Sequence, residues 1–414
     1  MNRSPLSLIF IIIAGEAIFM LPFLIPRLYR PLMLEAWHLT NTDIGAAFSA
    51  YGFAAMLSYI LGGPTADKYQ PRLLMTTSLV ATALGGLILL LFPSRFTFIS
   101  VYFFFGISTI FLMWGALIKV THITGGEENR SLAMGALDSG RGLAAAVMSS
   151  ALVFIISLFY GQEQLASNTV NGLNIIYYTV IVFTLFISLG VWYTLKNHQD
   201  IEQEIKQKWD ISKALQIVKS YKIWLLSTII LSSYCGYKGI DNYSIYLVDV
   251  HQHSLASSSL FTSIIFWLRP ITALLAGVIA DRVHTKIRAG RFIILFALLL
   301  MGALFQLLLA LNIFTNFNYI FGIILCSATF AYALRSIYFS IFGDLKINDN
   351  LIGTTVGIVS FVGFLPDMFF GIITGHMIDS NPGPVGYTHT FLFTASFLLI
   401  GAIASFLLYR KQKF

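Results

Sequence analysis

Twelve long apolar segments, separated by short polar breaks, constrain this chain more than any other feature. A helix needs roughly 20 apolar residues to cross a bilayer, and these segments are about that long or longer. Charged residues make up 11% of the chain, whereas soluble domains carry about 25%, and the mean hydropathy is +0.78. The alternating pattern of membrane barrel strands is absent from the segments. We therefore predict an all-α membrane protein with spans at residues 5–33, 43–64, 73–93, 98–121, 132–160, 172–195, 222–249, 257–280, 291–312, 317–341, 352–377 and 391–410.

The spans fall into two sets of six around a polar, lysine-rich stretch. This pattern predicts a six-helix bundle over 1–195, a cytoplasmic linker over 196–221 and a second six-helix bundle over 222–414. Within the linker, Trp209, Ile211, Leu215 and Val218 recur at near-helical spacing, which indicates either an amphipathic helix on the membrane surface or a flexible tether. The first span carries Glu16 and is too long for a cleavable signal peptide.

Basic residues lie in loops on alternate sides of the spans, which is how topology is encoded in membrane proteins. On this count both termini are cytoplasmic, and Arg95 is the main basic residue of the opposite loops. We expect a multi-pass protein of a bacterial inner membrane. The net charge of +7 is spread over these loops, so we expect no nucleic-acid partner.

One short motif occurs twice, half a chain apart. Gly63 to Lys68 and Gly277 to Arg282 share the pattern G-x-x-x-D-[K/R], and their aspartates, Asp67 and Asp281, lie 214 positions apart (281 minus 67). A basic residue follows each copy, Arg72 and Lys286. A repeat at half-chain spacing is typical of a duplicated bundle. The glycines are interpreted as sites of close helix approach, and the aspartates as helix caps or partners of an arginine on the next helix.

The repeated motif resembles the loop signature of the major facilitator superfamily of membrane transporters. The resemblance implies twelve transmembrane helices in two pseudo-symmetric six-helix bundles, and a latch role for Gly63, Asp67, Lys68, Arg72, Gly277, Asp281, Arg282 and Lys286. Lys68 stands where the family has arginine, and Val283 with His284 stands where it commonly has glycine. The segment around Asp138 and Arg141 also resembles the branch that carries organic phosphates and sugar acids.

Ionisable residues inside the spans are the candidates for function, because each costs about 2.5–3.5 kcal/mol to insert. The spacing of Glu16 and Arg27 places both on one face of a uniform helix, and Arg30 is interpreted as interfacial. In the seventh span, Lys238 and Asp241 are spaced to pair. The resemblance implies that spans one, four, seven and ten line the cavity. The predicted substrate-binding residues are Arg27, Trp114, Tyr234, Lys238, Tyr332, Arg335 and Tyr338.

Two further assignments leave alternatives open. Asp138 and Arg141 in the fifth span form either a self-neutralising pair or a substrate contact, and Lys119 has either a structural or a substrate role. Carboxylates in a low-dielectric cavity disfavour their charged form, so Glu16, Asp241 and Asp367 are the predicted proton-coupling residues. The buried set counts six cations, Arg27, Lys119, Arg141, Lys238, Arg269 and Arg335, against four anions, Glu16, Asp138, Asp241 and Asp367.

The surplus of positive charge predicts a small polar solute, anionic or zwitterionic, because guanidinium groups match carboxylate and phosphate geometry. We predict a proton-coupled symporter that works by alternating access as a monomer in the lipid bilayer. Amino acid or nucleoside uptake, an efflux pump of the same fold, and a membrane receptor or sensor are the alternatives. No enzyme motif, cofactor site or metal-ligand spacing is present, and Cys235 and Cys326 lie inside apolar spans, so we expect no enzyme activity and no cofactor.

Overall fold

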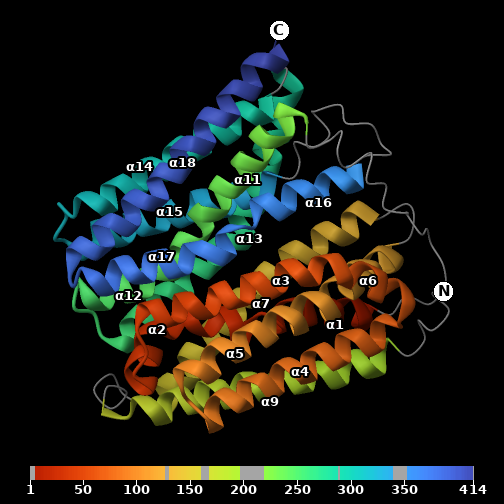
Figure 1. Cartoon of the computed structure of the whole chain (residues 1–414), viewed down its shortest axis with the longest axis vertical. Helices are drawn as coiled ribbons and strands as arrows, with labels where there is room; N and C mark the ends of the chain where they lie inside the picture. Colours follow the sequence, from red (N-terminus) through yellow and green to blue (C-terminus); the bar gives the residue numbers. More distant parts are fainter. Residues whose placement is uncertain are drawn as a thin grey trace. The chain divides into compact units, whose positions relative to one another are not determined.

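The structure, a computed structural model, describes residues 5–125, 130–159, 167–195, 219–287, 290–338 and 352–413. All regular elements in these ranges are helices (Figure 1). Ten of them are long and apolar enough to cross a membrane. The helix α3 (Asn41–Lys68) and the pair α11 (Tyr221–Gly239) and α12 (Tyr243–Asp249) occupy the second and seventh predicted spans. Twelve spanning segments therefore follow one another along the chain.

The chain forms two compact units, and each is described by itself. The first comprises the described parts of Met1–Glu204 together with Ser244–Trp267, so residues from the middle of the chain pack with the N-terminal helices. Its further helices are α1 (Pro5–Ala17), η1 (Met20–Leu24), α2 (Ile25–Trp37), α4 (Pro71–Leu91), α5 (Arg95–Gly106), η2 (Ile107–Trp114), α6 (Gly115–Gly125), α7 (Arg130–Phe159), α9 (Thr169–Thr194) and the start of α13 (Leu255–Lys286).

The second unit comprises the described parts of Ile205–Tyr243 and Leu268–Phe414. Helices α11, α14 and α18 pack against one another to form its core, with Leu226, Leu299 and Leu398 fully or almost fully buried. Its helices are α11, η3 (Ile240–Asn242), the rest of α13, α14 (Gly290–Leu311), α15 (Phe317–Ile337), α16 (Ile352–Gly363), α17 (Pro366–Ser380) and α18 (Pro384–Lys413).

Local sequence explains where the helices begin and break. Thr40 accepts a hydrogen bond from the backbone N–H of Asp43, whose carboxylate accepts one from the N–H of Thr40, and this capping box starts α3. The first span is interrupted by the π-helical segment η1, which contains Pro22. Tyr29 has non-helical dihedral angles inside α2, two residues before Pro31, because proline cannot continue a regular helix.

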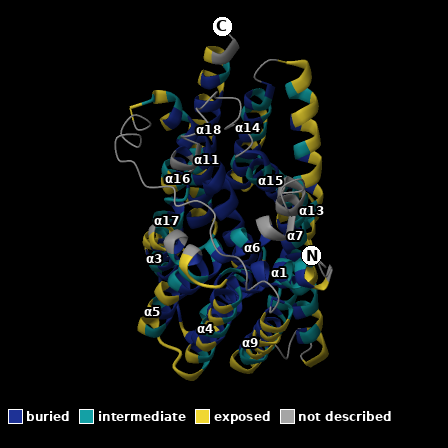
Figure 2. Ribbon diagram, turned by 90° about the vertical axis from the view of Figure 1, so that its right-hand side faces the viewer, coloured by how far each residue is buried: buried dark blue, intermediate teal, exposed yellow. Residues whose placement is uncertain are grey.

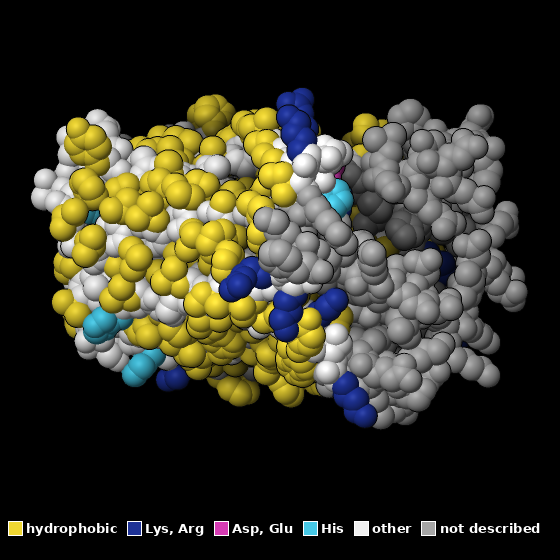
Figure 3. All heavy atoms as spheres, turned by 90° about the horizontal axis from the view of Figure 1, so that it is seen from above, with side chains coloured by type: hydrophobic (Ala, Val, Ile, Leu, Met, Phe, Trp, Pro, Cys, Tyr) yellow, Lys and Arg dark blue, Asp and Glu magenta, His cyan; other side chains and the backbone are white. Residues whose placement is uncertain are grey.

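Large apolar side chains cover the outside of the helices. In Figure 2 the exposed residues lie along the outer faces of α4, α9 and α13, while the buried residues face neighbouring helices. On α9 the exposed residues Val182, Phe186 and Leu189 recur at helical spacing and form an apolar stripe. The face shown in Figure 3 is mainly hydrophobic, and its Lys and Arg side chains form a few separate groups. Such a surface suits a hydrocarbon environment.

The repeated motif differs from its interpretation as a loop, since α3 continues through Lys68 and α13 through Lys286. The prediction of a close helix approach at Gly277 is wrong, because a Cβ atom there would meet no described atom within 4 Å. Near the first copy of the motif, α3 does make a close approach, at Gly62, where a Cβ would stand 3.3 Å from the carbonyl oxygen of Ile110. For Gly63 and Asp67 the structure describes only the helical backbone. Most of the predicted linker, residues 196–218, lies outside the described residues.

Candidate functional site

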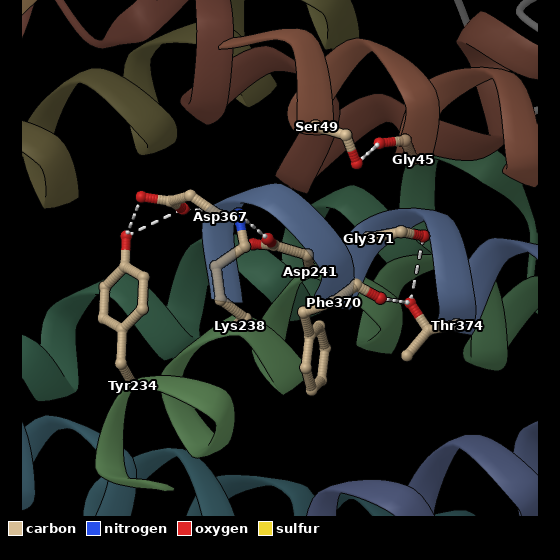
Figure 4. Close-up of polar contacts among 9 residues, drawn as sticks. All are labelled: Gly45, Ser49, Tyr234, Lys238, Asp241, Asp367, Phe370, Gly371 and Thr374. Atoms are coloured by element: carbon tan, nitrogen blue, oxygen red, sulfur yellow. Dashed lines mark hydrogen bonds and ion pairs between the residues drawn. The ribbon is translucent and has the colours of Figure 1, made fainter. Parts of the chain in front are cut away.

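Four ionisable or hydroxyl side chains meet inside the second unit, and we call them the Lys238 cluster: Tyr234, Lys238, Asp241 and Asp367. The Lys238 Nζ lies 3.1 Å from Asp241 Oδ2 and 3.5 Å from Asp367 Oδ1. The Tyr234 hydroxyl donates to both carboxylate oxygens of Asp367, at 3.0 Å each. Figure 4 shows the ammonium group of Lys238 between the two carboxylates. The lysine side chain is only 2% exposed, so these contacts replace its hydration.

Two breaks in helical structure place these side chains. After Gly239 the seventh span changes from α-helix to the short 3-10 turn η3, which contains Asp241. On the other side, α17 begins at Pro366, and Asp367 lies in its first turn. Proline suits the first position of a helix, and an acidic residue there interacts favourably with the helix dipole. The sequence thus places one carboxylate at each break.

The Arg335 guanidinium lies beside the Lys238 cluster, stacked on aromatic rings. Its Cζ is 4.1 Å from the ring centroid of Tyr237 and 5.9 Å from that of Tyr234, in cation–π range. Tyr332, another predicted substrate residue, is 2% exposed, and its ring lies 6.2 Å from that of Tyr237. Tyr338, also predicted to bind substrate, is part of the buried hydrophobic core of this unit.

A second charged site lies in the first unit, and we call it the Arg141 site: Glu16, Phe19, Trp114 and Arg141. The Arg141 Nε lies 3.3 Å from Glu16 Oε2 and donates to the carbonyl oxygen of Gly15 at 2.9 Å. The guanidinium also stands 5.3 Å from the ring of Phe19 and 5.5 Å from that of Trp114. The site therefore joins α1, α7 and the fourth span.

Irregular backbone surrounds the Arg141 site. Trp114 is the last residue of the π-helical segment η2, and Phe19 directly precedes the π-helical segment η1. Such π turns are frequent at functional sites. Asp138, the expected partner of Arg141, is exposed, whereas Arg141 is buried. The carboxylate of Glu16 lies at the Nε of Arg141, and the sequence analysis did not pair these two residues.

Arg27 and Arg30 are buried within the first unit, at 5% and 3% exposure. The Arg27 guanidinium lies 6.0 Å from the ring of Phe266. Arg30, interpreted from the sequence as interfacial, lies almost two turns before the end of α2, which continues to Trp37. The expectation that Glu16 and Arg27 share a face assumed a uniform α-helix, and the π turn of η1 between them changes that register.

Three basic residues make contacts at helix ends. The Lys119 Nζ donates to the carbonyl oxygen of Ala66 at 3.0 Å, and so satisfies an orphan carbonyl in the last turn of α3. Arg72 stacks on Trp192, with its Cζ 3.7 Å from the ring centroid. Asp281 pairs with Arg291 on the next helix at 2.9 Å. The hydrogen bond of Lys119 to Ala66 is a structural contact. The remaining predicted latch residues Lys68, Arg282 and Lys286 have exposed side chains.

Hydroxyl groups link helices from distant parts of the chain inside the first unit. The Ser263 Oγ lies 3.1 Å from Ser149 Oγ and 3.2 Å from Ser150 Oγ, and Trp267 Nε1 donates to Ser150 at 3.0 Å. In the same unit, Ser244 Oγ donates to the carbonyl oxygen of Leu28 at 3.1 Å. These contacts join α7 to α13 and α2 to α12. The sequence analysis did not single them out, since serines in spans carry no charge signal.

The buried charges are unequal in number. Among the described residues of the first unit, Arg27, Arg30 and Arg141 are buried, against Glu16 and Asp43. In the second unit, Lys238 and Arg269 are buried and Arg335 is half-buried, against Asp241 and Asp367. Among the residues the structure describes, no group of His, Cys, Asp and Glu side chains could hold a metal ion. The two cysteines, Cys235 and Cys326, are free.

Comparisons with known proteins agree with this architecture. The family model described as Major Facilitator Superfamily matches residues 6–371. The chain is 27% identical over 420 residues to the inner membrane protein YqcE of Escherichia coli (strain K12), covering 99% of this chain and 95% of that protein. It is 22% identical over 396 residues to the probable sulfoacetate transporter SauU of Cupriavidus necator, covering 91% and 87%.

A solved structure has the same fold. It is a bacterial homolog of the human lysosomal transporter Spinster in an inward-facing, occupied conformation, with a TM-score of 0.74, 15% sequence identity, and coverage of 99% of this chain and 97% of that one. The all-helical architecture of the present chain, with spanning segments in all twelve predicted positions, is the one predicted from its apolar segments. With a family model matching most of its length, this membrane protein belongs to the Major Facilitator Superfamily.

Proposed function

We propose that the protein transports a small organic anion across a bacterial inner membrane by alternating access, coupled to proton symport. The observation that carries this proposal is the surplus of buried arginine in the first unit, where Arg27, Arg30 and Arg141 are buried against Glu16 and Asp43, and Asp43 pairs with the exposed Arg95. A guanidinium keeps its charge in a buried site and matches carboxylate, sulfonate or phosphate oxygens with paired donors. The name of the relative SauU, a probable sulfoacetate transporter, supports this class of cargo.

We assign anion binding mainly to the Arg141 site. The guanidinium of Arg141 has Nε engaged by Gly15 and Glu16, which orients its plane between the rings of Phe19 and Trp114. An arriving anion would compete with Glu16 for the arginine. Exchange of one anion for another at a single guanidinium gives a simple link between cargo binding and protonation of Glu16.

We assign the second coupling position to the Lys238 cluster. One ammonium group serves two carboxylates there, so a proton can neutralise the second carboxylate. Asp241 and Asp367 are the proton acceptors in this scheme. Tyr332 lines the same region through its contact with Tyr237.

The proposed conformational cycle involves two sets of contacts between helices. In this proposal the two predicted bundles, residues 1–195 and 222–414, rock about the binding region. The serine contacts of Ser149 and Ser150 with Ser263 would separate in one half of the cycle, and the Asp281–Arg291 pair near the repeated motif would respond in the other. Both termini are placed in the cytoplasm, following the basic loops, and the working unit is a monomer.

Ligand-induced stabilisation of the detergent-solubilised protein tests the choice of cargo. A ligand present at 100 times its Kd stabilises the folded state by about 2.7 kcal/mol. We expect an organic anion such as sulfoacetate, a sugar acid or an organic phosphate to raise the unfolding temperature, and Arg141→Gln to abolish this shift. Arg95→Gln, which changes an exposed arginine paired with Asp43, is the matched control. Stabilisation by neutral nucleosides alone would contradict the proposal.

Transport itself is measured in proteoliposomes that hold the purified protein. Uptake of the stabilising anion is expected to rise when the outside is made acidic, and a proton ionophore is expected to abolish accumulation above the outside concentration. The variant Glu16→Gln is expected to keep exchange of cargo but lose uphill uptake. Binding without any movement of the anion across the membrane would favour a receptor.

A further inference from the structure

An apolar groove lies between two helices of the second unit, on the side where α14 begins and α18 ends. Ile293 and Phe296 of α14 and Phe406 and Tyr409 of α18 line it, and its cavity volume is about 220 Å³. The rings of Phe296 and Phe406 stand 5.4 Å apart. Small-molecule sites usually measure about 300–1,000 Å³ and contain converging polar groups. This groove is smaller and apolar, so its size and lining suit a section of a hydrocarbon chain.

Cationic side chains lie just beyond the groove on the same helix. Arg410 follows Phe406 by four residues, so the two side chains occupy neighbouring turns of one helix face. Arg410 and Lys411 are exposed, and the Lys411 Nζ stands 4.1 Å from the ring centroid of Tyr221 on α11. Arg410 therefore stands one turn beyond the groove residue Phe406, while Lys411 lies at the same helix end on the side of α11.

The surrounding side chains are those of a membrane–water boundary. Tyr221 and Trp224 are 46% and 48% exposed at the start of α11, and Tyr and Trp are enriched where helices leave the bilayer. Asp281, near the end of α13, pairs with Arg291 at the start of α14 at 2.9 Å. That pairing offsets its repulsion of an anionic headgroup. Hydrocarbon contact and positive charge thus meet at one membrane edge.

We propose that this groove binds an anionic phospholipid of the bilayer, with one acyl chain against Ile293, Phe296 and Phe406 and the phosphate at Arg410, and with Lys411 adding positive charge at the same helix end. Basic side chains at the end of a cleft between spanning helices are the chemistry that recognises anionic headgroups. The site belongs to the second unit alone and involves none of the residues assigned to cargo or protons. Its occupancy is independent of which solute the protein transports.

The test compares two lipids with identical acyl chains, phosphatidylglycerol and phosphatidylcholine, added to the full-length protein in neutral detergent. Native mass spectrometry counts retained lipid, and thermal unfolding reports stabilisation. We expect phosphatidylglycerol to be retained at least several-fold more than phosphatidylcholine and to raise the unfolding temperature further. The charge variant Arg410→Gln with Lys411→Gln is expected to remove this preference. Ile293→Trp, which fills the groove, is expected to reduce retention of both lipids.

Arg95→Gln is the matched control, because it removes an exposed positive charge from the first unit and leaves the groove unchanged. It is expected to keep the preference for phosphatidylglycerol. Unfolding of each variant in phosphatidylcholine shows that it is folded before the lipids are compared. Equal retention of the two lipids by the unmodified chain, or an unchanged preference in the charge variant, would overturn the proposal, as would dimerisation through this face.

Discussion

The ammonium group of Lys238 on α11 lies 3.5 Å from the carboxylate of Asp367 on α17, inside the second unit. The same nitrogen is 3.1 Å from Asp241, so Lys238 already has two anionic partners before any cargo arrives. An incoming anion would have to displace one of them. For that reason we propose a role for Lys238 in coupling and not in direct capture of substrate.

Removing the Lys238 ammonium group is expected to destabilise the folded protein, because it leaves two carboxylates inside the second unit without their shared cation. Breaking a buried ion pair by removing one partner destabilises proteins by about 3–5 kcal/mol. We expect Lys238→Met to lose about that much free energy of unfolding, measured by denaturation in detergent. The double variant Lys238→Met with Asp241→Asn is expected to recover part of the loss. A single variant as stable as the parent would show that the cluster is not a stabilising ion pair.

Arg141→Lys separates charge from geometry at the Arg141 site. Lysine keeps the positive charge but lacks the planar fork with an Nε donor for Gly15. We expect affinity for the stabilising anion to fall about 10-fold to 100-fold, as expected for a loss of about 1.5–3 kcal/mol in hydrogen bonds to charged groups. Titration by thermal shift measures the change. Affinity in Arg95→Lys is expected to match that of the unmodified protein, and unchanged affinity in Arg141→Lys would remove Arg141 from the binding site.

The serine contacts between α7 and α13 provide a cross-linking test of conformational change. The Oγ atoms of Ser149 and Ser263 are 3.1 Å apart, and a disulfide needs Cβ atoms about 3.5–4.5 Å apart. In a background in which Cys235 and Cys326 are changed to serine, we expect the pair Ser149→Cys and Ser263→Cys to cross-link on oxidation. Transport should then stop and return on reduction.

The control for this experiment is Ser263→Cys alone under the same oxidation. It is expected to transport at the rate of the cysteine-free background. Full transport by the cross-linked pair would mean that α7 and α13 need not separate during the cycle. The experiment therefore tests the mobility of these helices without depending on the identity of the cargo, provided that one transported anion is available.

Two histidines in the loop between α12 and α13 make the free energy of unfolding depend on pH. Burial lowers the pKa of His251 below 6.5, and the charge of His253 lowers it further; burial also lowers the pKa of His253. The unfolded chain therefore binds more protons than the folded one as the pH falls below about 6.5, and folding stability decreases there. Above that pH both histidines are neutral in the folded and the unfolded chain, so they no longer lower the stability.

We expect the unfolding temperature to fall as the pH is lowered from 7 through this range, and His251→Gln with His253→Gln to flatten the dependence. The rings of these histidines stand edge-on to Tyr246 and Phe261, at 4.8 and 5.5 Å, so Gln also removes ring packing. His389→Gln is a suitable control for loss of a histidine elsewhere. An identical pH profile in the double variant would exclude the pair as the source.

The spans were predictable because the bilayer demands long apolar helices whatever their tertiary contacts are. The proximity of Lys238 and Asp241 was predictable for a related reason, since residues three apart on a helical turn are neighbours. Contacts between helices were not predictable in the same way. The position of Glu16 at Arg141 depends on how α1 packs against α7, and a single sequence contains no direct signal for that packing.

The differences from the sequence analysis have identifiable physical causes. Arg30 was expected near the end of its span because the apolar pattern ends near Met33, while the helix itself continues to Trp37. Gly277 looked like a packing glycine by analogy with its motif, but open space surrounds it. The roles of Tyr237 beneath Arg335 and Phe19 beside Arg141 were missed because an aromatic residue in a span is usually packing, and only the position of the neighbouring cation distinguishes them.

The π-helical turn at Met20–Leu24 has one more consequence. A π turn accommodates an additional residue, so a change of this segment to regular α-helix would rotate everything on one side of it by about 100° relative to the other. Glu16 and Arg27 lie on opposite sides of that turn. A local rearrangement of backbone hydrogen bonds in the first span would therefore turn the carboxylate of Glu16 about the helix axis relative to the guanidinium of Arg27.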